Sequence, residues 1–381
     1  MKTYDYIIIG AGCAGLSLLM RIIDADETCS KKILLIDKAT KNNNDRTWCF
    51  WEKDRGYFED IVYRKWNKLF FKNEHLTKPL DMGGYEYKMI RAIDFYNFCF
   101  ERIRLLSNIE IKYADVTDVT FNNQQYIIQT KDELFTAKAK HVFSSLINEH
   151  STGSNHWLLL QHFKGWIIET QEERFNANEA MFMDFNIPQH HEAEFVYMLP
   201  LSERKALVEY TVFSKEILPA QEYDIQLENY ITRQLHIEKY HIAETEFGII
   251  PMTNKRFSFF ENGIYNIGSA GGQTKASTGY TFQFIQKQAA CISKALSTDK
   301  DIKNCGNNIS RFHLYDSILL NVLCQRRMRG SDIFSRLFAA VPASRIFKFL
   351  DNETGFMDEL TILKSMPVKT FGLAALREII K

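Results

Sequence analysis

The chain has 381 residues, enough for one large two-part domain or two ordinary ones. Hydrophobic residues make up 45% and charged residues 25%, which is typical of a soluble globular protein. The 47 basic residues balance the 47 acidic ones, and this balance argues against a nucleic-acid partner.

The first residues have the pattern of a dinucleotide-binding unit. Residues 4–9 predict a strand, and Gly10, Gly12 and Gly15 follow in G-x-G-x-x-G spacing before a helical pattern. A second predicted strand ends at Asp37. In such a unit the glycines allow a tight turn, close approach of the pyrophosphate and close helix–strand packing, while the acid accepts ribose hydroxyls. We therefore expect these four residues to bind a dinucleotide; the alternative is a glycine-rich turn in an ordinary α/β fold.

Two later segments favour FAD over a nicotinamide dinucleotide. After Asp37, residues 38–51 predict a loop and not a continuing βαβ unit. A second glycine-rich segment comes late in the chain, with a strand up to Gly268, a turn containing Gly271 and Gly272, and a helix from about residue 280. Flavoproteins of this type place such a segment against the ribityl chain and pyrophosphate of FAD.

The remaining elements follow in blocks. Residues 87–106 predict a helix entered near Asp94, and Arg91 just before it is expected to approach the flavin pyrophosphate. Strands follow to about residue 147, residues 157–250 predict an antiparallel sheet, and the chain is predicted to be helical from about residue 285.

These elements predict an α/β fold with a Rossmann-type FAD-binding domain, an interleaved antiparallel β-sheet substrate domain and a helical C-terminal region. The expected ranges are 1–50, 85–150 and 245–295 for the FAD-binding domain, 51–84 and 151–244 for the substrate-binding domain, and 296–381 for the helical region.

One carboxylate interrupts an apolar predicted strand over residues 205–214. Side chains alternate along a strand, so Glu209 shares a face with Leu207, Thr211 and Phe213. A charge on a buried face is costly unless it is paired or protonated. Glu209 therefore either faces water or lies in an apolar pocket as an acid.

The cysteine pattern bears on the cellular compartment. Seven cysteines occur without a C-x-x-C pair, which argues against a disulfide framework and against a zinc site. We expect no metal, and reduced thiols in a cytoplasmic protein.

Several segments together resemble one enzyme family. They include "DYIIIGAGCAGLSL", "DRTWCFWE", "FKGWIIET", "FVYMLPLSERKALVEYT", "GIIPMT" and "GSAGGQTKASTGYTF", which occur in the same order over roughly residues 4–290. In this respect the chain resembles the flavin-dependent lycopene cyclases of the bacterial β-cyclase type.

The resemblance implies a reaction and a set of residues. It implies that the linear ψ-end groups of lycopene are cyclised to β-rings, giving γ-carotene and β-carotene, by a non-redox isomerisation that uses reduced FAD, with NADPH only as the reductant. Glu209 corresponds to the essential carboxylate of the family and is the expected acid. Trp48, Phe50, Trp51 and Thr211 are the candidate residues of the substrate pocket.

The sequence departs from the family at two single positions and at the end of one predicted strand. Tyr210 stands where the family usually has an acid, and Lys275 stands where relatives often have His or Pro. The predicted strand over residues 141–146 lacks the Asp-Ala-Arg type of ending that many relatives show. The alternative functions are an FAD-dependent monooxygenase or reductase acting on a lipophilic substrate, and a carrier that binds a carotenoid unchanged. The Phe-rich C-terminal helices are either core or an interfacial patch, and a lipid-soluble substrate favours peripheral contact with a membrane.

Overall fold

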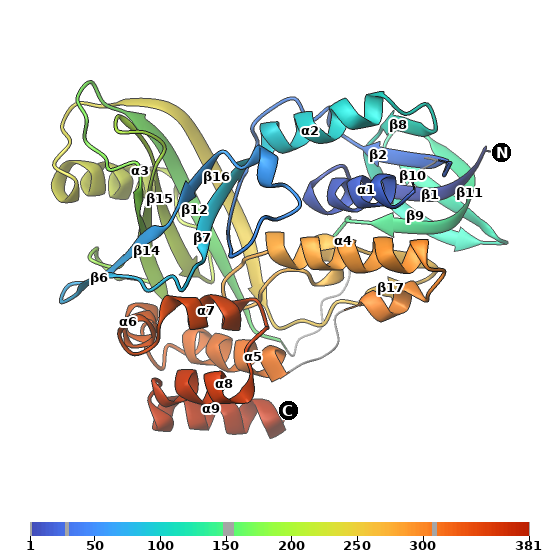
Figure 1. The fold of residues 1–381 in the computed structure, drawn as a ribbon. Helices are drawn as coiled ribbons and strands as arrows, with labels where there is room; N and C mark the ends of the chain where they lie inside the picture. Colours follow the sequence, from blue (N-terminus) through green and yellow to red (C-terminus); the bar gives the residue numbers. More distant parts are fainter. Residues whose placement is uncertain (1, 27–29, 148–155, 307–310, 381) are drawn as a thin grey trace.

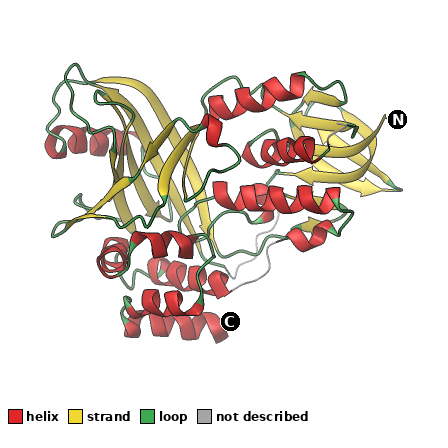
Figure 2. Ribbon diagram, viewed as in Figure 1, coloured by secondary structure: helices red, strands yellow, loops and turns green. Residues whose placement is uncertain are grey.

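The computed structural model describes residues 2–26, 30–147, 156–306 and 311–380. Across these residues the elements form three β-sheets surrounded by helices (Figures 1 and 2). One sheet lies at the end of the molecule that contains the N-terminus, and the largest antiparallel sheet lies at the opposite end. The C-terminal helices form a group of their own beside the antiparallel sheet.

The first sheet has a parallel core of five neighbouring strands: β18 (Ile264–Asn266), β11 (Leu134–Ser144), β1 (Lys2–Ile9), β2 (Ile33–Asp37) and β8 (Ile109–Tyr113). Short strand β17 (Phe260–Glu261) extends it beside β18. The helices of this part are α1 (Cys13–Ala25), α2 (Ala92–Arg104) and α4 (Phe282–Ser297).

Both faces of the parallel core are covered, which explains the uninterrupted apolar run in β1. Ile8 packs in the cluster that includes α1, α2 and α4. Ile7 and Ile9 pack instead with the antiparallel pair β9 (Val116–Asn122) and β10 (Gln125–Thr130). A strand buried on both faces needs apolar side chains at every position.

The second sheet has seven strands, in the order β16 (His241–Thr253), β12 (Leu158–Glu169), β15 (Lys205–Ser214), β14 (Ala193–Pro200), β13 (Glu179–Asp184), β5 (Lys68–Lys72) and β6 (Thr77–Pro79). Every neighbouring pair is antiparallel except β13 and β5. A third sheet, in the order β3 (Thr47–Glu52), β7 (Glu86–Arg91) and β4 (Arg64–Trp66), links the two larger ones along the chain, and η1 (Glu59–Ile61) precedes β4.

Strand β15 illustrates how the second sheet is packed. Val208 and Tyr210 belong to a buried cluster with α3 (Ala220–Asn229) and η2 (Tyr230–Gln234) on one face. Leu207 and Phe213 belong to the core on the other face, toward the C-terminal helices. Because side chains alternate, Glu209 points to the same inner face as Leu207 and Phe213.

The C-terminal part consists of short helices: α5 (Arg311–Cys324), α6 (Gly330–Ala340), α7 (Ala343–Leu350), α8 (Phe356–Lys364) and α9 (Val368–Ile380), preceded by η4 (Ile302–Cys305). Side chains of α6 and α7 complete the core beneath the second sheet, where Phe347 stacks on Trp51 at 4.7 Å. Within the described residues, no helix has the length and apolar character needed to cross a bilayer.

The predicted fold class is confirmed, and three local predictions are wrong. Residues 87–91 form β7 and not the start of a helix, because they pair with β3 on one side and β4 on the other. Strand β11 begins at Leu134, whereas the sequence predicts this strand over residues 141–146; its first half forms a strand because β10 pairs with it. Cys291 and Cys305 form a disulfide between α4 and η4, so not all of the thiols are reduced.

Candidate functional site

The first glycine motif has the geometry of a phosphate-binding turn. Gly10 has φ +98°, a conformation that side chains rarely adopt. A Cβ on Gly15 would lie 1.9 Å from the carbonyl oxygen of Gly10, so only glycine lets α1 approach the end of β1. At Gly12, the N-cap of α1, a Cβ would have no atom within 4 Å. The space above the N-terminus of α1 is therefore open to a ligand, and a helix N-terminus favours an anion.

Asp37 lies at the carboxyl end of β2, beside this turn. Its Oδ2 accepts a hydrogen bond from the amide of Ala11 at 2.6 Å, and its Oδ1 accepts one from the amide of Ala39 at 2.8 Å. Lys41 Nζ lies 3.3 Å from Oδ1. The carboxylate is held in place by the backbone, and each oxygen has remaining capacity to accept a hydroxyl.

The second glycine segment folds against the first. Gly268 has φ +61°, and a Cβ there would lie 2.7 Å from the Cβ of Ala14 in α1. Gly271 and Gly272 complete η3 (Gly268–Gly271) and its left-handed cap. The structure thus brings the two predicted glycine motifs together.

Arg91 is the N-cap residue of α2. Its guanidinium forms hydrogen bonds of 2.7 and 2.9 Å with Asp94 and stacks on the ring of Tyr63. These contacts hold the Arg91 guanidinium against Asp94 and Tyr63 at the start of α2.

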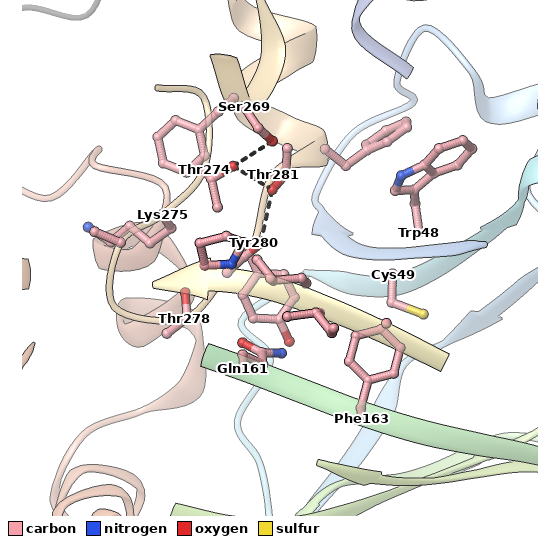
Figure 3. Close-up of a pocket in the computed structure, with 18 of the residues that line it drawn as sticks. Trp48, Cys49, Gln161, Phe163, Ser269, Thr274, Lys275, Thr278, Tyr280 and Thr281 are labelled. Carbon is pink, nitrogen blue, oxygen red and sulfur yellow. Dashed lines mark hydrogen bonds between the residues drawn. The ribbon is translucent and has the colours of Figure 1, made fainter. Parts of the chain in front are cut away.

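A cavity of about 950 Å³ extends from the second glycine segment into the space between the sheets. This volume is at the upper end of the ~300–1,000 Å³ usual for small-molecule sites. Its walls come from β3, β12, β14, β15, β16, α5 and the loop after η3. Figure 3 shows this loop above β16, where hydrogen bonds connect Ser269, Thr274 and Thr281.

The inner wall of the cavity contains a row of residues that runs across four strands. Neighbouring strands pair these residues in register. Tyr197 of β14 is paired with Glu209 of β15, and Glu209 is paired with Gly165 of β12. Gly165 is paired on its other side with Glu246 of β16. Glu209 and Glu246 both line the cavity. Thr211 lies on the same face of β15 as Glu209, but it is fully buried and does not line the cavity. Its Oγ1 donates a hydrogen bond to Glu209 Oε1 at 2.9 Å.

The environment of Glu209 favours its protonated form. Burial raises the pKa of the Glu209 carboxyl well above its ordinary value, and the nearby Glu246 carboxyl raises this pKa further. Burial likewise raises the pKa of Glu246. Glu209 thus lies on the inner side of the sheet, where it lines the cavity and is partly buried.

Aromatic side chains surround the two carboxyls. Tyr87, Tyr197 and Tyr280 line the cavity, and the hydroxyls of Tyr197 and Tyr280 lie 3.3 Å apart. Trp48 lines the same cavity (Figure 3). Aromatic faces near an apolar site can stabilise a cation.

Two of the aromatic residues predicted for the pocket lie elsewhere. Phe50 stacks on Phe282, with ring centroids 4.3 Å apart, and lines a separate small pocket. Trp51 stacks on Phe347 and donates a hydrogen bond from Nε1 to Asp351. Both side chains belong to the core around β3 and do not line the large cavity.

The two single-residue departures from the family pattern have separate structural roles. Tyr210 points away from the cavity, and its hydroxyl donates a hydrogen bond of 2.5 Å to Glu194 Oε2. Lys275 lines the cavity and forms a buried ion pair of 3.0 Å with Asp316 of α5.

Glu246 is the residue that the sequence analysis missed. It lies in β16, two residues before the "GIIPMT" segment. Phe247 and Ile249 line the cavity as well as Glu246 and Gly248, so no local alternation in the sequence identifies Glu246.

The fold is shared with flavin enzymes of known structure. A flavoprotein/dehydrogenase from Cytophaga hutchinsonii is similar over 99% of this chain and 100% of its own, with a TM-score of 0.65 at 10% identity. A geranylgeranyl bacteriochlorophyll reductase-like protein from Thermoplasma acidophilum is similar over 98% and 96%, with a TM-score of 0.59 at 12% identity. The flavin-dependent brominase Bmp2 is similar over 100% and 98%, with a TM-score of 0.58 at 12% identity. The fold is thus that of FAD-binding flavoproteins.

The family is established by a sequence match. The pattern of the family described as "Lycopene cyclase protein" matches residues 5–376, nearly the whole chain. This chain belongs to the lycopene cyclase family, and its function is therefore related to carotenoids. A comparison with curated proteins gave no significant match.

Proposed function

We propose that this protein is an FAD-dependent lycopene β-cyclase, and that Glu209 is its catalytic acid. The observation that carries the proposal is the position of Glu209 in the inner wall of a large cavity, where burial favours the protonated carboxyl. An alkene is a very weak base, so the acid that protonates it must hold its proton until the substrate is in place.

The reaction balances without a net change in electrons. The Glu209 proton adds to the terminal double bond of a ψ-end group, and the neighbouring carbon becomes a tertiary cation. The π electrons of the next trisubstituted double bond form the ring C–C bond and move the positive charge into the ring. Loss of a proton from the adjacent ring carbon gives the double bond of the β-ring. Tyr87, Tyr197 and Tyr280 would face the cation and exclude water from it.

The glycine motifs are suited to FAD. We assign Gly10, Gly12 and Gly15 to the pyrophosphate, Asp37 to the ribose, and Gly268, Gly271 and Gly272 to the ribityl side. The open space above Gly12 supports this assignment, because a phosphate can approach the backbone there without meeting a side chain. Reduced FAD would supply negative charge near the cation, and NADPH is proposed only as its reductant. The proposed FAD-binding domain retains the ranges 1–50 and 85–150, but its third range begins after β16, because β16 (His241–Thr253) belongs to the second sheet.

We also propose peripheral contact with a membrane, because the substrate is lipid-soluble. Exposed apolar side chains gather on α8 and α9: Phe356, Met357, Val368, Leu373, Leu376, Ile379 and Ile380. Lys369 and Arg377 on α9 suit an anionic lipid surface. Helix α9 also lies beside one end of the cavity, since Glu378 accepts a hydrogen bond from Trp157, the neighbour of the lining residue Leu158.

The test is anaerobic incubation of the purified protein with lycopene in lipid vesicles after chemical reduction of its flavin. We expect cyclised carotenoid by chromatography while flavin absorbance stays that of the reduced form. Glu209→Gln should abolish cyclisation and retain flavin, whereas the matched control Glu203→Gln, in the exposed turn before β15, should be fully active. Unchanged lycopene would indicate a carrier, and flavin oxidised in step with product would indicate a redox enzyme.

A further inference from the structure

A second carboxyl lies beside Glu209, and the sheet leaves a gap for it. Gly165 lies in register between Glu209 and Glu246. A Cβ on Gly165 would lie 2.9 Å from Glu246 Cγ and 3.1 Å from Glu246 Oε1. The Glu246 side chain therefore lies over Gly165, in the direction of Glu209, so the two carboxyls are close enough to interact electrostatically.

The contacts of this pair are neutral. Thr211 donates to Glu209, and Thr47 Oγ1 donates to Glu246 Oε2 at 2.9 Å. Within the described part of the chain, neither carboxyl forms a salt bridge with a cation. Two adjacent buried carboxyls without a cation cannot both remain ionised, so the pair retains one proton.

The other acidic groups of the cavity wall are engaged elsewhere or hold their protons. Asp316 is paired with Lys275, and Asp45 accepts a hydrogen bond from Tyr96. Burial raises the pKa of the Cys49 thiol and of the Tyr197 and Tyr280 hydroxyls, so these groups are poor bases. Glu246 is the wall group beside Glu209 that can be anionic while Glu209 is protonated.

We propose that Glu209 and Glu246 form a proton-sharing pair, in which Glu209 gives the proton that starts cyclisation and Glu246 accepts the proton that leaves the ring. The proposal rests on the proposed cyclase function. The carboxyl pair and the substrate together carry one negative charge throughout: the pair goes from −1 to −2 as the substrate becomes a cation, and returns to −1 when Glu246 takes the ring proton. Transfer of that proton from Glu246 back to Glu209 restores the starting state.

The activity test compares Glu246 with a glutamate outside the site. Glu246→Gln removes the base but preserves the shape, whereas Glu238→Gln removes the same charge from an exposed position in the loop before β16. Loss of a positioned general base typically costs 10²–10⁴ in rate, so we expect the rate of cyclisation by Glu246→Gln to fall about 100-fold or more with FAD still bound. Glu238→Gln should stay near the wild-type rate. A smaller loss in Glu246→Gln, with unchanged product, would overturn the assignment of Glu246 as the base.

A measurement without substrate tests the shared proton separately. The groups that face the pair are Cys49 of β3, Tyr87 of β7, Tyr197 of β14, Tyr280 of the loop after η3, and Glu244 of β16. pH-difference infrared spectra should show a carboxyl of wild-type protein that remains protonated at neutral pH and is missing in Glu209→Gln. In Glu246→Gln the like charge is gone, so Glu209 should lose its proton at lower pH than in wild type. An unchanged titration would overturn the sharing, whether or not lycopene is the substrate.

A third variant changes Gly165, which lies between Glu209 and Glu246 in the sheet. Gly165→Ala places a methyl group against Glu246 and 3.0 Å from Leu207 Cδ1, so the two carboxyls must separate. We expect the infrared titration of Glu209 to shift downward and cyclisation to fall with it. Circular dichroism and bound-flavin absorbance identify properly folded protein. Folded Gly165→Ala with wild-type titration and wild-type rate would contradict the proposal.

Discussion

The buried pair of Lys275 and Asp316 allows a quantitative prediction. The two side chains are 1% and 8% exposed, and their charged atoms lie 3.0 Å apart. Lys275 also donates a hydrogen bond to Asn352 Oδ1 at 2.7 Å and lies over the rings of Phe312 and Phe349. Together these contacts fix the loop after η3 to α5 and α7, so they define one wall of the cavity.

Lys275→Met keeps the length of the side chain and leaves Asp316 buried without its partner. Breaking a buried pair in this way costs about 3–5 kcal/mol, a large part of the ~5–15 kcal/mol by which proteins are usually stable. With a urea dependence of ~1–3 kcal/mol per molar, the midpoint of unfolding should fall by about 1 M or more.

The assay is urea unfolding followed by tryptophan fluorescence. Lys68→Met is the matched control, because Lys68 forms an exposed pair with Glu179 at 3.6 Å and such surface pairs are worth ~0–1 kcal/mol. Lys275→Met combined with Asp316→Leu should recover most of the loss, since no charge is then left unpaired. The reasoning is refuted if Lys275→Met has the wild-type midpoint, or if the double variant is less stable than Lys275→Met.

Three further predictions concern pH, the cofactor and the membrane. Burial raises the pKa of Asp351 to about 6, above its unfolded value of ~3.8, so its protonation stabilises the fold at low pH and this contribution is lost as pH rises through about 6. The free energy of unfolding of the wild type, relative to that of Asp351→Asn, should therefore fall by about 3 kcal/mol between pH 3.8 and pH 7. Urea unfolding of both proteins across this pH range measures the difference, and an equal pH dependence in the two proteins would contradict the prediction. Gly12→Val should fold but lose FAD, whereas Gly15→Val should not fold, because its Cβ meets the Gly10 carbonyl; bound-flavin absorbance and circular dichroism of each variant decide the point. Leu376→Glu with Ile379→Glu should weaken sedimentation with anionic vesicles at least tenfold, whereas Leu134→Glu, at an exposed apolar position on β11, should have no effect; equal binding of both variants would remove α9 as the contact.

The parts of the site that depend on local spacing could be predicted from the sequence. Gly10, Gly12 and Gly15 follow one another within a single turn, and their spacing alone specifies the geometry of that turn. Glu209 was identified because one charge interrupts an apolar strand and because that strand resembles a known family. The glycine spacing and the interrupted strand need only neighbouring residues, whereas the resemblance depends on the order of segments along the chain and not on their contacts in space.

The parts that depend on pairing between distant segments could not be predicted in this way. Glu246 meets Glu209 only through the register of β16, β12 and β15, which no local pattern encodes. Phe50 and Trp51 have the residue type expected of a carotenoid pocket, but aromatic residues serve equally well in a core, and here they pack on Phe282 and Phe347. The disulfide between Cys291 and Cys305 likewise depends on η4 folding back on α4.

The row across the second sheet also has a consequence for biosynthesis. Thr47 donates a hydrogen bond to Glu246, which is 199 residues later in the chain, and the loop that closes the cavity follows Glu246. During translation β15, which carries Glu209, therefore leaves the ribosome before β16, which carries Glu246. It also leaves before the loop after η3 that closes the cavity. Contacts of such high sequence separation form slowly, and an incomplete chain exposes apolar strands that promote aggregation. The nascent protein therefore exposes these apolar strands until β16 has been made, and we expect fragments that end before β16 to be insoluble when they are expressed.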